Sequence, residues 1–521
     1  MRLPLFDSIY ILSSLWTAPA GSPVCASSSS SMPGTMHEAA LSSTPRISAD
    51  VTAFVDVNVV PMDTERVLTN QTVLVQDGRI IALGPMGRVP VPSGALRIDG
   101  RGKYLIPGFT DMHYHDYSAE FARADEHASG LFAQLASGVT AIRNLNAVSK
   151  DDARKFRSFK MVEEKLSPHV YMAGELWEFA KPGLGLDSTA AAYKAAGYEF
   201  IVAPNPDSIL AAARRLGLPP AAHFHGGSLE YLQALGVYGG SMEHLYSFMS
   251  YEFLDSLQQG QANRSESELR SLAAAARRTG LWVTPTLDCL VTEWANRGPR
   301  YVALTRQLVK AMQDAGVGLL LGIEGGAAHK ELTALVRAGL TPYQALLTGT
   351  RNVAEYFGTL DESGTVAIEK QADLVLLYGN PLADIRHTRE PAGVMRGGRW
   401  FDRAELDQRL LASPKAWLMS TVVQSGVKPF LTTEEQHHKL NACLQQLEAL
   451  ADSLEQAKPL EQRGRLSYKR TLRLVTNELG VMRTILPAEH RETFDPMART
   501  WMREQARQGY RMVVPGVPLK P

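Results

Sequence analysis

Short apolar segments alternate with helical patterns through the middle of the chain, and few folds accommodate this alternation. Strands that alternate with helices form βα units, whose strands pair in parallel. Eight such units over about 250 residues are the usual extent of a (β/α)8 barrel, in which chemistry takes place at the carboxyl ends of the strands. The sequence therefore predicts an α/β fold with a TIM-like (β/α)8 barrel. The eight strand candidates span residues 105–109, 140–144, 170–174, 199–203, 221–225, 240–244, 282–286 and 317–322.

The first strand candidate leads into two histidines separated by one residue, in the segment YLIPGFTDMHYH at 104–115. Successive side chains of a strand point to opposite faces, so His113 and His115 are expected to project to the same side. If that side is the interior of a closed barrel, both imidazoles can bind one metal ion. The alternative is a loop with two solvated histidines. A second pair, His223 and His225, shows that the spacing alone does not decide between the two interpretations.

Two further segments with strand patterns flank the barrel region. The first contains the Asp77-Gly78 pair between two alternating apolar runs, which is typical of a β-hairpin. The second contains another hairpin pattern at 394–400. We expect the two segments to pair into one module, and the helical tail to pack on the barrel or on another subunit. The expected domains are a leader (1–45), the first β part (46–105), the barrel (106–360), the second β part (361–403) and a helical extension (404–521).

Composition and charge restrict the function classes. Lys plus Arg and Asp plus Glu each number 54, so the overall charge gives no reason to expect nucleic acid or an anionic membrane surface as a partner. No run approaches the ~18 apolar residues of a membrane span. The three cysteines, Cys25, Cys289 and Cys443, lack CxxC spacing. A metal would therefore have to be bound by histidine and carboxylate side chains.

The N-terminal segment has some features of an export signal. Arg2 precedes a short apolar core at 8–16, and small residues surround Cys25. Asp7 interrupts this pattern, and the Ser-rich stretch that follows is equally typical of a disordered leader. The sequence leaves exported and cytoplasmic locations open.

Taken together, these motifs resemble the amidohydrolase superfamily, in particular its imidazolonepropionase-like and prolidase-like metal hydrolases. The resemblance covers roughly residues 51–402. It implies a barrel with one or two divalent metals and a composite β-sandwich formed by the flanking segments. The matching segments are LIPGFTDMHYH, GVTAIRNL, AAHFHGG, GGSMEHL, WVTPTL, HKELTALVRAGLTPYQALLTGTRNVAEYFG, QADLVLLYGNPLADI and MRGGRWF.

The resemblance also implies a ligand set. In the family, a histidine pair on the first strand, a histidine on the fifth, one on the sixth and a carboxylate on the eighth bind the metal. A set of imidazoles with one carboxylate suits zinc, and an open coordination position lowers the pKa of a bound water toward ~7. His225 is interpreted as structural, and Glu175 as a less favoured substitute ligand. The residues at the matching ligand positions are His113, His115, His223, His244 and Glu324.

Two positions depart from the family pattern. Where members with two metals carry a bridging lysine, this chain has Val202, which has no ligand atom. We therefore expect one divalent metal ion, zinc by its ligand types. Where the family has an aspartate on the eighth strand, this chain has Glu324. The added methylene displaces the carboxylate by about an ångström, a shift that can lower a catalytic rate ~100-fold.

The resemblance implies hydrolysis of a carbon–nitrogen bond in a small amide, dipeptide-like or cyclic amide substrate. Glu324 would pass the proton of a metal-activated water to the leaving nitrogen. His244 would bind the metal weakly or hydrogen-bond the developing oxyanion. The alternative, prompted by Val202 and Glu324, is a barrel with impaired catalysis that serves as a binding or assembly module. Substrate identity and self-association through the barrel or the helical tail remain open.

Overall fold

The computed structural model describes a set of segments with gaps between them. The chain divides into residues 1–48 and 49–521, and every described residue belongs to the second unit. Four residues discussed above, His223, His225, Glu175 and Glu324, lie outside the described residues, as do the leader and most of the predicted helical extension. The described residues are 51–115, 131–157, 165–174, 185–202, 211, 214–222, 236–237, 239–249, 253, 256–257, 259–289, 299–323, 327–412, 479–480 and 483.

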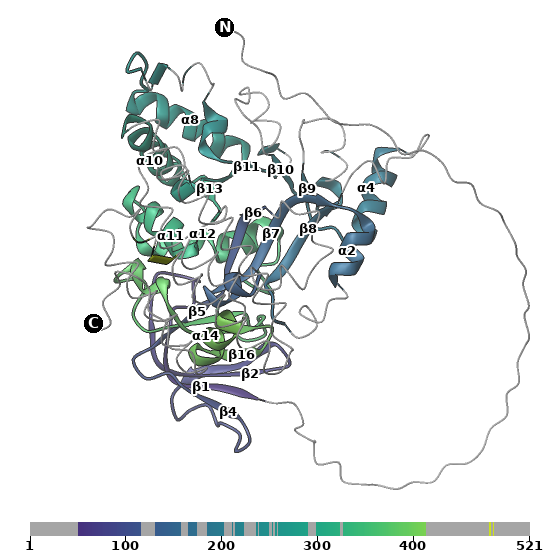
Figure 1. Cartoon of the computed structure of the whole chain (residues 1–521), viewed down its shortest axis with the longest axis vertical. Coiled ribbons are helices and arrows are strands. Elements are labelled where there is room, and N and C mark those ends of the chain that lie inside the picture. Colours follow the sequence, from purple (N-terminus) through teal and green to yellow (C-terminus); the bar gives the residue numbers. More distant parts are fainter. Residues whose placement is uncertain are drawn as a thin grey trace, which may run out of the picture. The chain divides into compact units, whose positions relative to one another are not determined.

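Strands from both flanking segments belong to one eight-stranded mixed sheet (Figure 1). Its order is β16-β15-β14-β5-β1-β2-β3, with β4 paired to β1. The two segments meet where β14 pairs antiparallel with β5, in a register that places Val375 opposite Ile106. The strands are β1 (Thr52–Val59), β2 (Leu68–Gln76), β3 (Arg79–Pro85), β4 (Leu96–Asp99), β5 (Tyr104–Pro107), β14 (Leu374–Leu377), β15 (Pro391–Arg396) and β16 (Arg399–Asp402).

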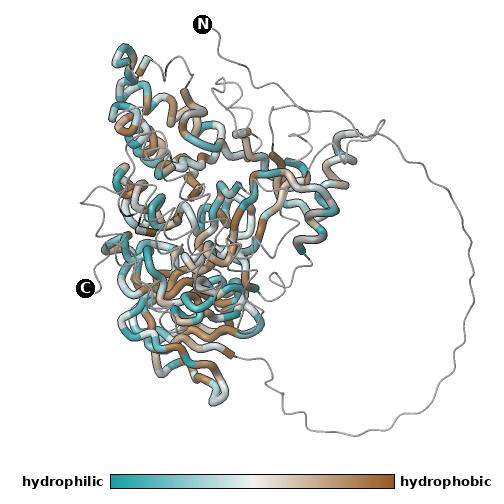
Figure 2. Tube along the Cα trace, viewed as in Figure 1, coloured by the Kyte–Doolittle hydropathy of each residue, from teal (hydrophilic) through white to brown (hydrophobic). Residues whose placement is uncertain are grey.

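The sheet is stabilised by an apolar layer to which both segments contribute. Phe54, Leu105 and Leu376 are completely or almost completely buried in one cluster, and the Trp400 ring packs edge-on against Phe54 with centroids 5.2 Å apart. Figure 2 shows apolar residues, in brown, along these strands. The hairpin between β2 and β3 turns at Asp77-Gly78, where both residues have positive φ as a tight hairpin turn requires.

The predicted βα strands form two parallel sheets. One has the order β6-β7-β8 and the other β13-β12-β11-β10-β9. Every strand candidate of the barrel region contains or overlaps one of these strands. Among the described residues the two sheets share no strand pairing, so closure into one eight-stranded barrel is not established by the pairings. The strands are β6 (Phe109–Tyr114), β7 (Val139–Val148), β8 (His169–Gly174), β9 (Ile201–Val202), β10 (Pro220–Ala222), β11 (Ser241–Glu243), β12 (Trp282–Thr284) and β13 (Gly318–Leu319).

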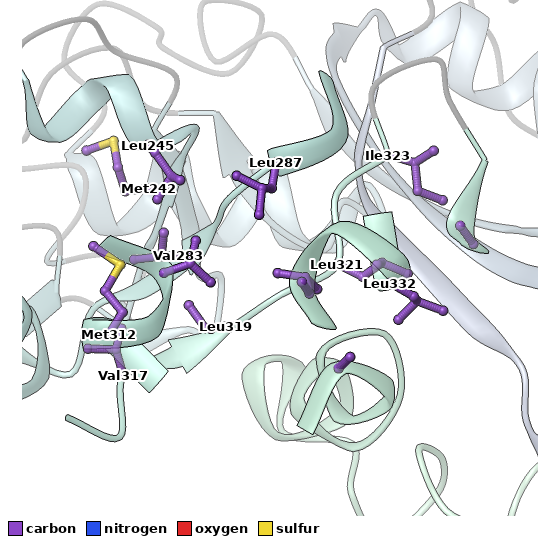
Figure 3. Packing of buried hydrophobic residues seen from close by; sticks show 14 of the residues in the cluster. Met242, Leu245, Val283, Leu287, Met312, Val317, Leu319, Leu321, Ile323 and Leu332 are labelled. Carbon is purple, nitrogen blue, oxygen red and sulfur yellow. The ribbon is translucent and has the colours of Figure 1, made fainter. Parts of the chain in front are cut away.

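Helices between the strands cover an extensive apolar core. Ser265 caps α8 through a capping box with Glu268, and Gly280 ends the helix in the left-handed conformation. In Figure 3, Met312 lies near Val283 and Leu319. None of the helices in the described part of the chain has both the length and the apolar character needed to cross a membrane. The helices are α2 (Lys150–Arg157), α4 (Leu186–Ala195), η3 (Leu245–Phe248), α8 (Glu266–Thr279), α10 (Pro299–Asp314), α11 (Ala328–Arg337), α12 (Pro342–Thr348), α13 (Arg351–Phe357), η5 (Ile385–Arg389) and α14 (Arg403–Ala412).

The segment 104–115 differs from its prediction, which placed one strand at 105–109. It contains two strands in different sheets, β5 in the mixed sheet and β6 in a parallel sheet, and Gly108 separates them. The N–H of Gly108 donates to the carbonyl of Asp373 at 2.8 Å. A Cβ on Gly108 would lie 2.1 Å from Oγ1 of Thr140 on the neighbouring strand. The chain changes sheets at a residue without a side chain because the backbone passes directly over Thr140.

Gly108→Ala is therefore expected to lower the free energy of unfolding by about 1–3 kcal/mol, because the added methyl group overlaps a buried side chain. Gly94→Ala is the matched control: a Cβ there meets no atom within 4 Å, and the change is expected to stay within ~0.5 kcal/mol. Urea denaturation of both variants measures the difference. Equal stabilities of the two variants would contradict the close approach at Gly108.

Candidate active site

Three of the five predicted ligand residues come together at the carboxyl ends of parallel strands. His113 lies near the end of β6, His115 follows that strand, and His244 follows β11. The ring centroid of His113 is 4.9 Å from that of His115 and 4.3 Å from that of His244. The fold thus brings together histidines that lie up to 131 positions apart in the sequence. His223 and Glu324 lie outside the described residues.

The spacing of the first histidine pair fits a shared cation. The Nε2 atoms of His113 and His115 are 3.1 Å apart. Two imidazole nitrogens that bind one tetrahedral zinc, each at ~2.0–2.1 Å, lie about 3.3 Å apart. Nδ1 of His115 is 2.9 Å from the amide Oδ1 of Asn146, which can only accept a hydrogen bond. The proton of neutral His115 is therefore on Nδ1, and burial lowers the pKa of this histidine.

A buried carboxylate sets the orientation of His113. Oε2 of Glu243 accepts a hydrogen bond from Nδ1 of His113 at 2.8 Å, and both side chains are completely buried. A carboxylate in this position holds the proton on Nδ1 and leaves the lone pair on Nε2, which faces His115. Histidine ligands in metal sites usually have such a partner. The sequence motif GGSMEHL contained Glu243, but only its neighbour His244 was singled out.

Arg143 compensates the charge of Glu243 in the interior. The guanidinium donates to Oε1 of Glu243 at 2.6 Å and to the carbonyl of Met112 at 2.8 Å. It also donates to the hydroxyls of Ser241, at 2.7 Å, and Tyr356, at 3.2 Å. Burial alone would raise the pKa of Glu243, but Arg143, His113 and Ser241 outweigh it and hold the pKa at about 2. Glu243 is therefore ionised at neutral pH.

Asp111 joins the first strand to the segment that precedes Glu324. Its Oδ1 accepts hydrogen bonds from the backbone N–H groups of His113 and Ile323, each at 2.9 Å. Burial raises the pKa of Asp111 to about 6, although these two N–H groups and Arg143 oppose the shift. Within the described residues, Oδ2 has no hydrogen-bond partner. A buried acceptor of this kind close to the histidines adds negative potential at this edge of the sheet.

His244 is held by a hydroxyl group on the turn that follows β12. Nδ1 of His244 lies 2.6 Å from Oγ1 of Thr286, and Oγ1 also lies 2.8 Å from the carbonyl oxygen of Pro285. Both His244 and Thr286 have positive φ, 64° and 46°. This conformation is unfavourable for a side chain with a Cβ and is found mainly where surrounding contacts enforce it.

Glu331, on α11, is a further buried carboxyl group near the site. Its two oxygens accept hydrogen bonds from successive backbone N–H groups, Leu287 at 2.8 Å and Asp288 at 2.6 Å. Burial raises the pKa of Glu331 to about 8, and the charges of Asp288 and Asp111 act in the same direction while the two N–H groups oppose it. Sequence reasoning missed this residue, because a Glu in a helical pattern looks like a solvated position.

Relative to Glu331→Gln, the wild-type protein is expected to lose stability as the pH rises from about 4.5 to about 8. The pKa of this group is 4.5 without the fold and about 8 within it, so the folded state binds up to one additional proton in this window. The unfolding free energy of the wild type then falls by at most ~1.4 kcal/mol per pH unit in this window. Below pH 4.5 the stabilisation from the raised pKa of Glu331 is fully present. Urea denaturation of both proteins at several pH values gives the unfolding free energy of the wild type minus that of Glu331→Gln. A rise of this difference with pH would contradict the prediction.

Three further residues of the barrel region have these surroundings. Val202 is half-buried on β9 and offers no ligand atom. His329 is the second residue of α11, and burial lowers its pKa to about 3, so it is neutral at physiological pH. Tyr114 is half-buried at the end of β6. Among the described residues, no three histidine, cysteine or carboxylate side chains form a group that could by itself bind a metal ion.

Comparison with solved structures defines the fold class. One such structure is a prolidase bound to N-methylphosphonate-L-proline, with a TM-score of 0.51 and 20% identity, over 68% of this chain and 100% of the prolidase. The likeness implies a TIM-barrel-type α/β fold. The sequence model of the amidohydrolase family matches residues 104–401, more than half of the chain. The chain belongs to the amidohydrolase family, and this confirms the resemblance drawn from its motifs.

Curated relatives are also similar in sequence, and they differ in length. An adenine deaminase from Ruegeria sp. (strain TM1040) is 23% identical over 331 residues, which cover 61% of this chain and 52% of the deaminase. An imidazolonepropionase from Rubrobacter xylanophilus is 25% identical over 363 residues, which cover 59% of this chain and 84% of the relative. The chain thus spans about half the length of the adenine deaminases it matches.

Proposed function

We propose that this chain is a metal-dependent hydrolase that cleaves a carbon–nitrogen bond with a metal-activated water. The observation that supports it most is the 3.1 Å separation of the Nε2 atoms of His113 and His115. Each imidazole has an acceptor on Nδ1, Glu243 for His113 and Asn146 for His115. This arrangement directs two lone pairs to one place, as zinc ligands require. Family membership supports hydrolysis of such bonds as the reaction class.

We assign a separate role to each residue of the proposed site. His113 and His115 would hold the cation together with His223, Glu324 and His244, and Val202 leaves no bridging ligand for a second one. When bound, a zinc-type ion lowers the pKa of a water and polarises the scissile carbonyl. Glu324 would accept the proton of that water and deliver it to the leaving nitrogen. Glu243 and Arg143 take no part in bond breaking and keep His113 in its ligand tautomer.

The substrate class follows from the relatives rather than from the described residues. Their names refer to adenine, imidazolonepropionate and, in the prolidase complex, a proline phosphonate. We infer a small molecule with an amide, peptide-like or cyclic amide bond.

The two parallel sheets are proposed to be parts of one (β/α)8 barrel. The N–H of Met112 on β6 donates to the carbonyl of Leu321, just beyond β13, at 2.7 Å. This bond joins the first and last barrel strands and supports closure on that side. With the mixed sheet as a composite β module, the barrel would extend over 106–360, and the β parts over 46–105 and 361–403. The leader and the helical extension complete the proposed organisation.

Elemental analysis of protein purified with metals present tests the proposal. We expect about one divalent ion per chain, and hydrolysis of at least one compound among acylated amino acids, dipeptides and lactams. Removal of the ion with a chelator should abolish hydrolysis, and added Zn²⁺ should restore it. Protein that neither retains nor rebinds a divalent ion would overturn the proposal.

The competing interpretation, a barrel with impaired catalysis, makes a different prediction for Glu324→Asp. This change restores the family carboxylate at that position. A gain of hydrolysis from near zero would support an impaired site, because the shorter side chain returns the carboxylate to the family geometry. A loss from measurable wild-type activity would support a site adapted to glutamate. The control is the metal content of the variant, which must equal that of the wild type for either conclusion.

A further inference from the structure

We propose that Glu331 is a positioning residue for His244: by holding the turn that carries Thr286, it keeps the His244 imidazole in the tautomer whose Nε2 can bind a cation. The inference rests on the metal-dependent function proposed above. It assigns a role to a residue of helix α11, and it selects between the two roles that the sequence left open for His244.

The first step is the attachment of Glu331 to the turn after β12. The carboxyl group is buried, and its oxygens accept the N–H groups of Leu287 at 2.8 Å and Asp288 at 2.6 Å. These are the two residues that follow Thr286. Two bonds from one planar carboxyl group to successive amides fix both the position and the orientation of this backbone segment.

The second step is the strained conformation that the attachment supports. Thr286 has φ 46°, which is rare for any residue with a Cβ and rarer still for a β-branched one. Such a conformation persists only where neighbouring contacts over-determine it. The Glu331 bonds lie directly after the strained residue, and the bond from the N–H of His244 to the carbonyl of Thr284, at 2.9 Å, lies two residues before it. Together they keep the Thr286 hydroxyl directed at His244.

The third step is the direction of the hydrogen bond at His244. A hydroxyl has one proton to donate, and Oγ1 of Thr286 donates it to the carbonyl of Pro285 at 2.8 Å. At its 2.6 Å contact with Nδ1 of His244, the hydroxyl oxygen must therefore accept. The proton of neutral His244 is on Nδ1 and the lone pair is on Nε2. A neutral His244 in this tautomer can bind a cation but cannot donate from Nε2 to an oxyanion.

Glu331→Gln tests the first step. Both oxygens of a carboxyl group can accept a backbone N–H, whereas the nitrogen of an amide cannot. The variant must therefore place an NH2 donor against the N–H of Leu287 or of Asp288. We expect about a tenfold weaker zinc affinity, as for other partners of metal ligands, measured by competition with a chromophoric chelator. Glu199→Gln is the matched control: Glu199 also accepts a backbone N–H, from Met172 at 2.9 Å, and it pairs with His169, which is not a candidate ligand. Its zinc affinity should equal that of the wild type.

Variants of Thr286 test the remaining steps. Thr286→Val keeps the shape but removes the hydroxyl, and should also weaken zinc binding about tenfold; Thr286→Ser should recover most of that loss. Because both residues act through the same hydroxyl, Glu331→Gln should cause little further loss in the Thr286→Val background. Additive losses, or a Glu331→Gln protein with a lower Tm but unchanged zinc affinity, would show a merely structural role and overturn the proposal.

A measurement without metal separates this proposal from the proposed function. Nitrogen-15 NMR of histidine-labelled, metal-free protein reports the tautomer of His244, assigned with a His244→Asn variant. An Nδ1–H tautomer in the wild type that is lost in Glu331→Gln supports the positioning role even if the wild type binds no zinc, in which case only the hydrolase proposal fails. The same tautomer in both proteins overturns the positioning role.

Discussion

Arg143→Met is expected to destabilise the protein by about 3–5 kcal/mol, the usual effect of removing one partner from a buried ion pair. Methionine fills most of the volume of the arginine side chain but supplies no charge and no donors. Glu243 would then remain completely buried with its carboxylate uncompensated, since Arg143 donates to it at 2.6 Å. The carbonyl of Met112 and the hydroxyl of Ser241 would lose a donor as well.

Chemical denaturation of three further proteins separates the causes of this loss. Arg386→Met removes an exposed guanidinium that pairs with Asp384, and should change stability by less than ~1 kcal/mol. The double variant Arg143→Met with Glu243→Gln should recover part of the stability, because no buried charge is left unpaired. The single variant Glu243→Gln completes the cycle. A loss below ~1 kcal/mol for Arg143→Met would show that Glu243 does not depend on this cation.

The strands of the fold could be predicted because their periodicity is local. Apolar runs such as the one before His113, and the Asp77-Gly78 turn, carry their structure in a few neighbouring residues. The change of sheets at Gly108 could not be predicted, because it depends on Thr140, which approaches only after the strands have paired. Residues 105–109 were therefore predicted as one strand. Strand pairing between distant segments is the part of a fold that local patterns describe least.

The candidate site was predictable at the level of its histidines and not at the level of their partners. The spacing of His113 and His115 made them candidate ligands, and the family motifs added His244. Arg143 lies inside an apolar strand pattern, where a single cation usually marks an edge or an exposed face. Its role depends on Glu243, 100 residues further on, which the fold brings to its guanidinium. Both sequence motifs, GVTAIRNL with Arg143 and GGSMEHL with Glu243, carried a signal of this pair. A charged residue in a buried strand needs a partner of opposite charge.

Glu243→Gln is expected to weaken zinc affinity by up to ~100-fold, although the two side chains have nearly the same shape. Arg143 and Ser241 both donate to Oε1 of Glu243, at 2.6 and 2.7 Å. In the variant, the amide oxygen must take this position, because an amide nitrogen there would face two donors. The NH2 group is then directed at Nδ1 of His113, 2.8 Å from the former Oε2.

An NH2 group at that place donates to Nδ1, so the proton of neutral His113 moves to Nε2. Nε2 is the atom that faces His115 at 3.1 Å, and its lone pair is then no longer available to a cation. Chelator competition measures the affinity, and Ser241→Ala is the control: it removes one donor to Glu243 but keeps the carboxylate on His113. We expect Ser241→Ala to lower Tm yet keep zinc affinity within about threefold of the wild type, whereas Glu243→Gln lowers the affinity much more than the Tm. Equal zinc affinities in Glu243→Gln and the wild type would mean that His113 does not bind the cation through Nε2, since a proton on that atom excludes a metal.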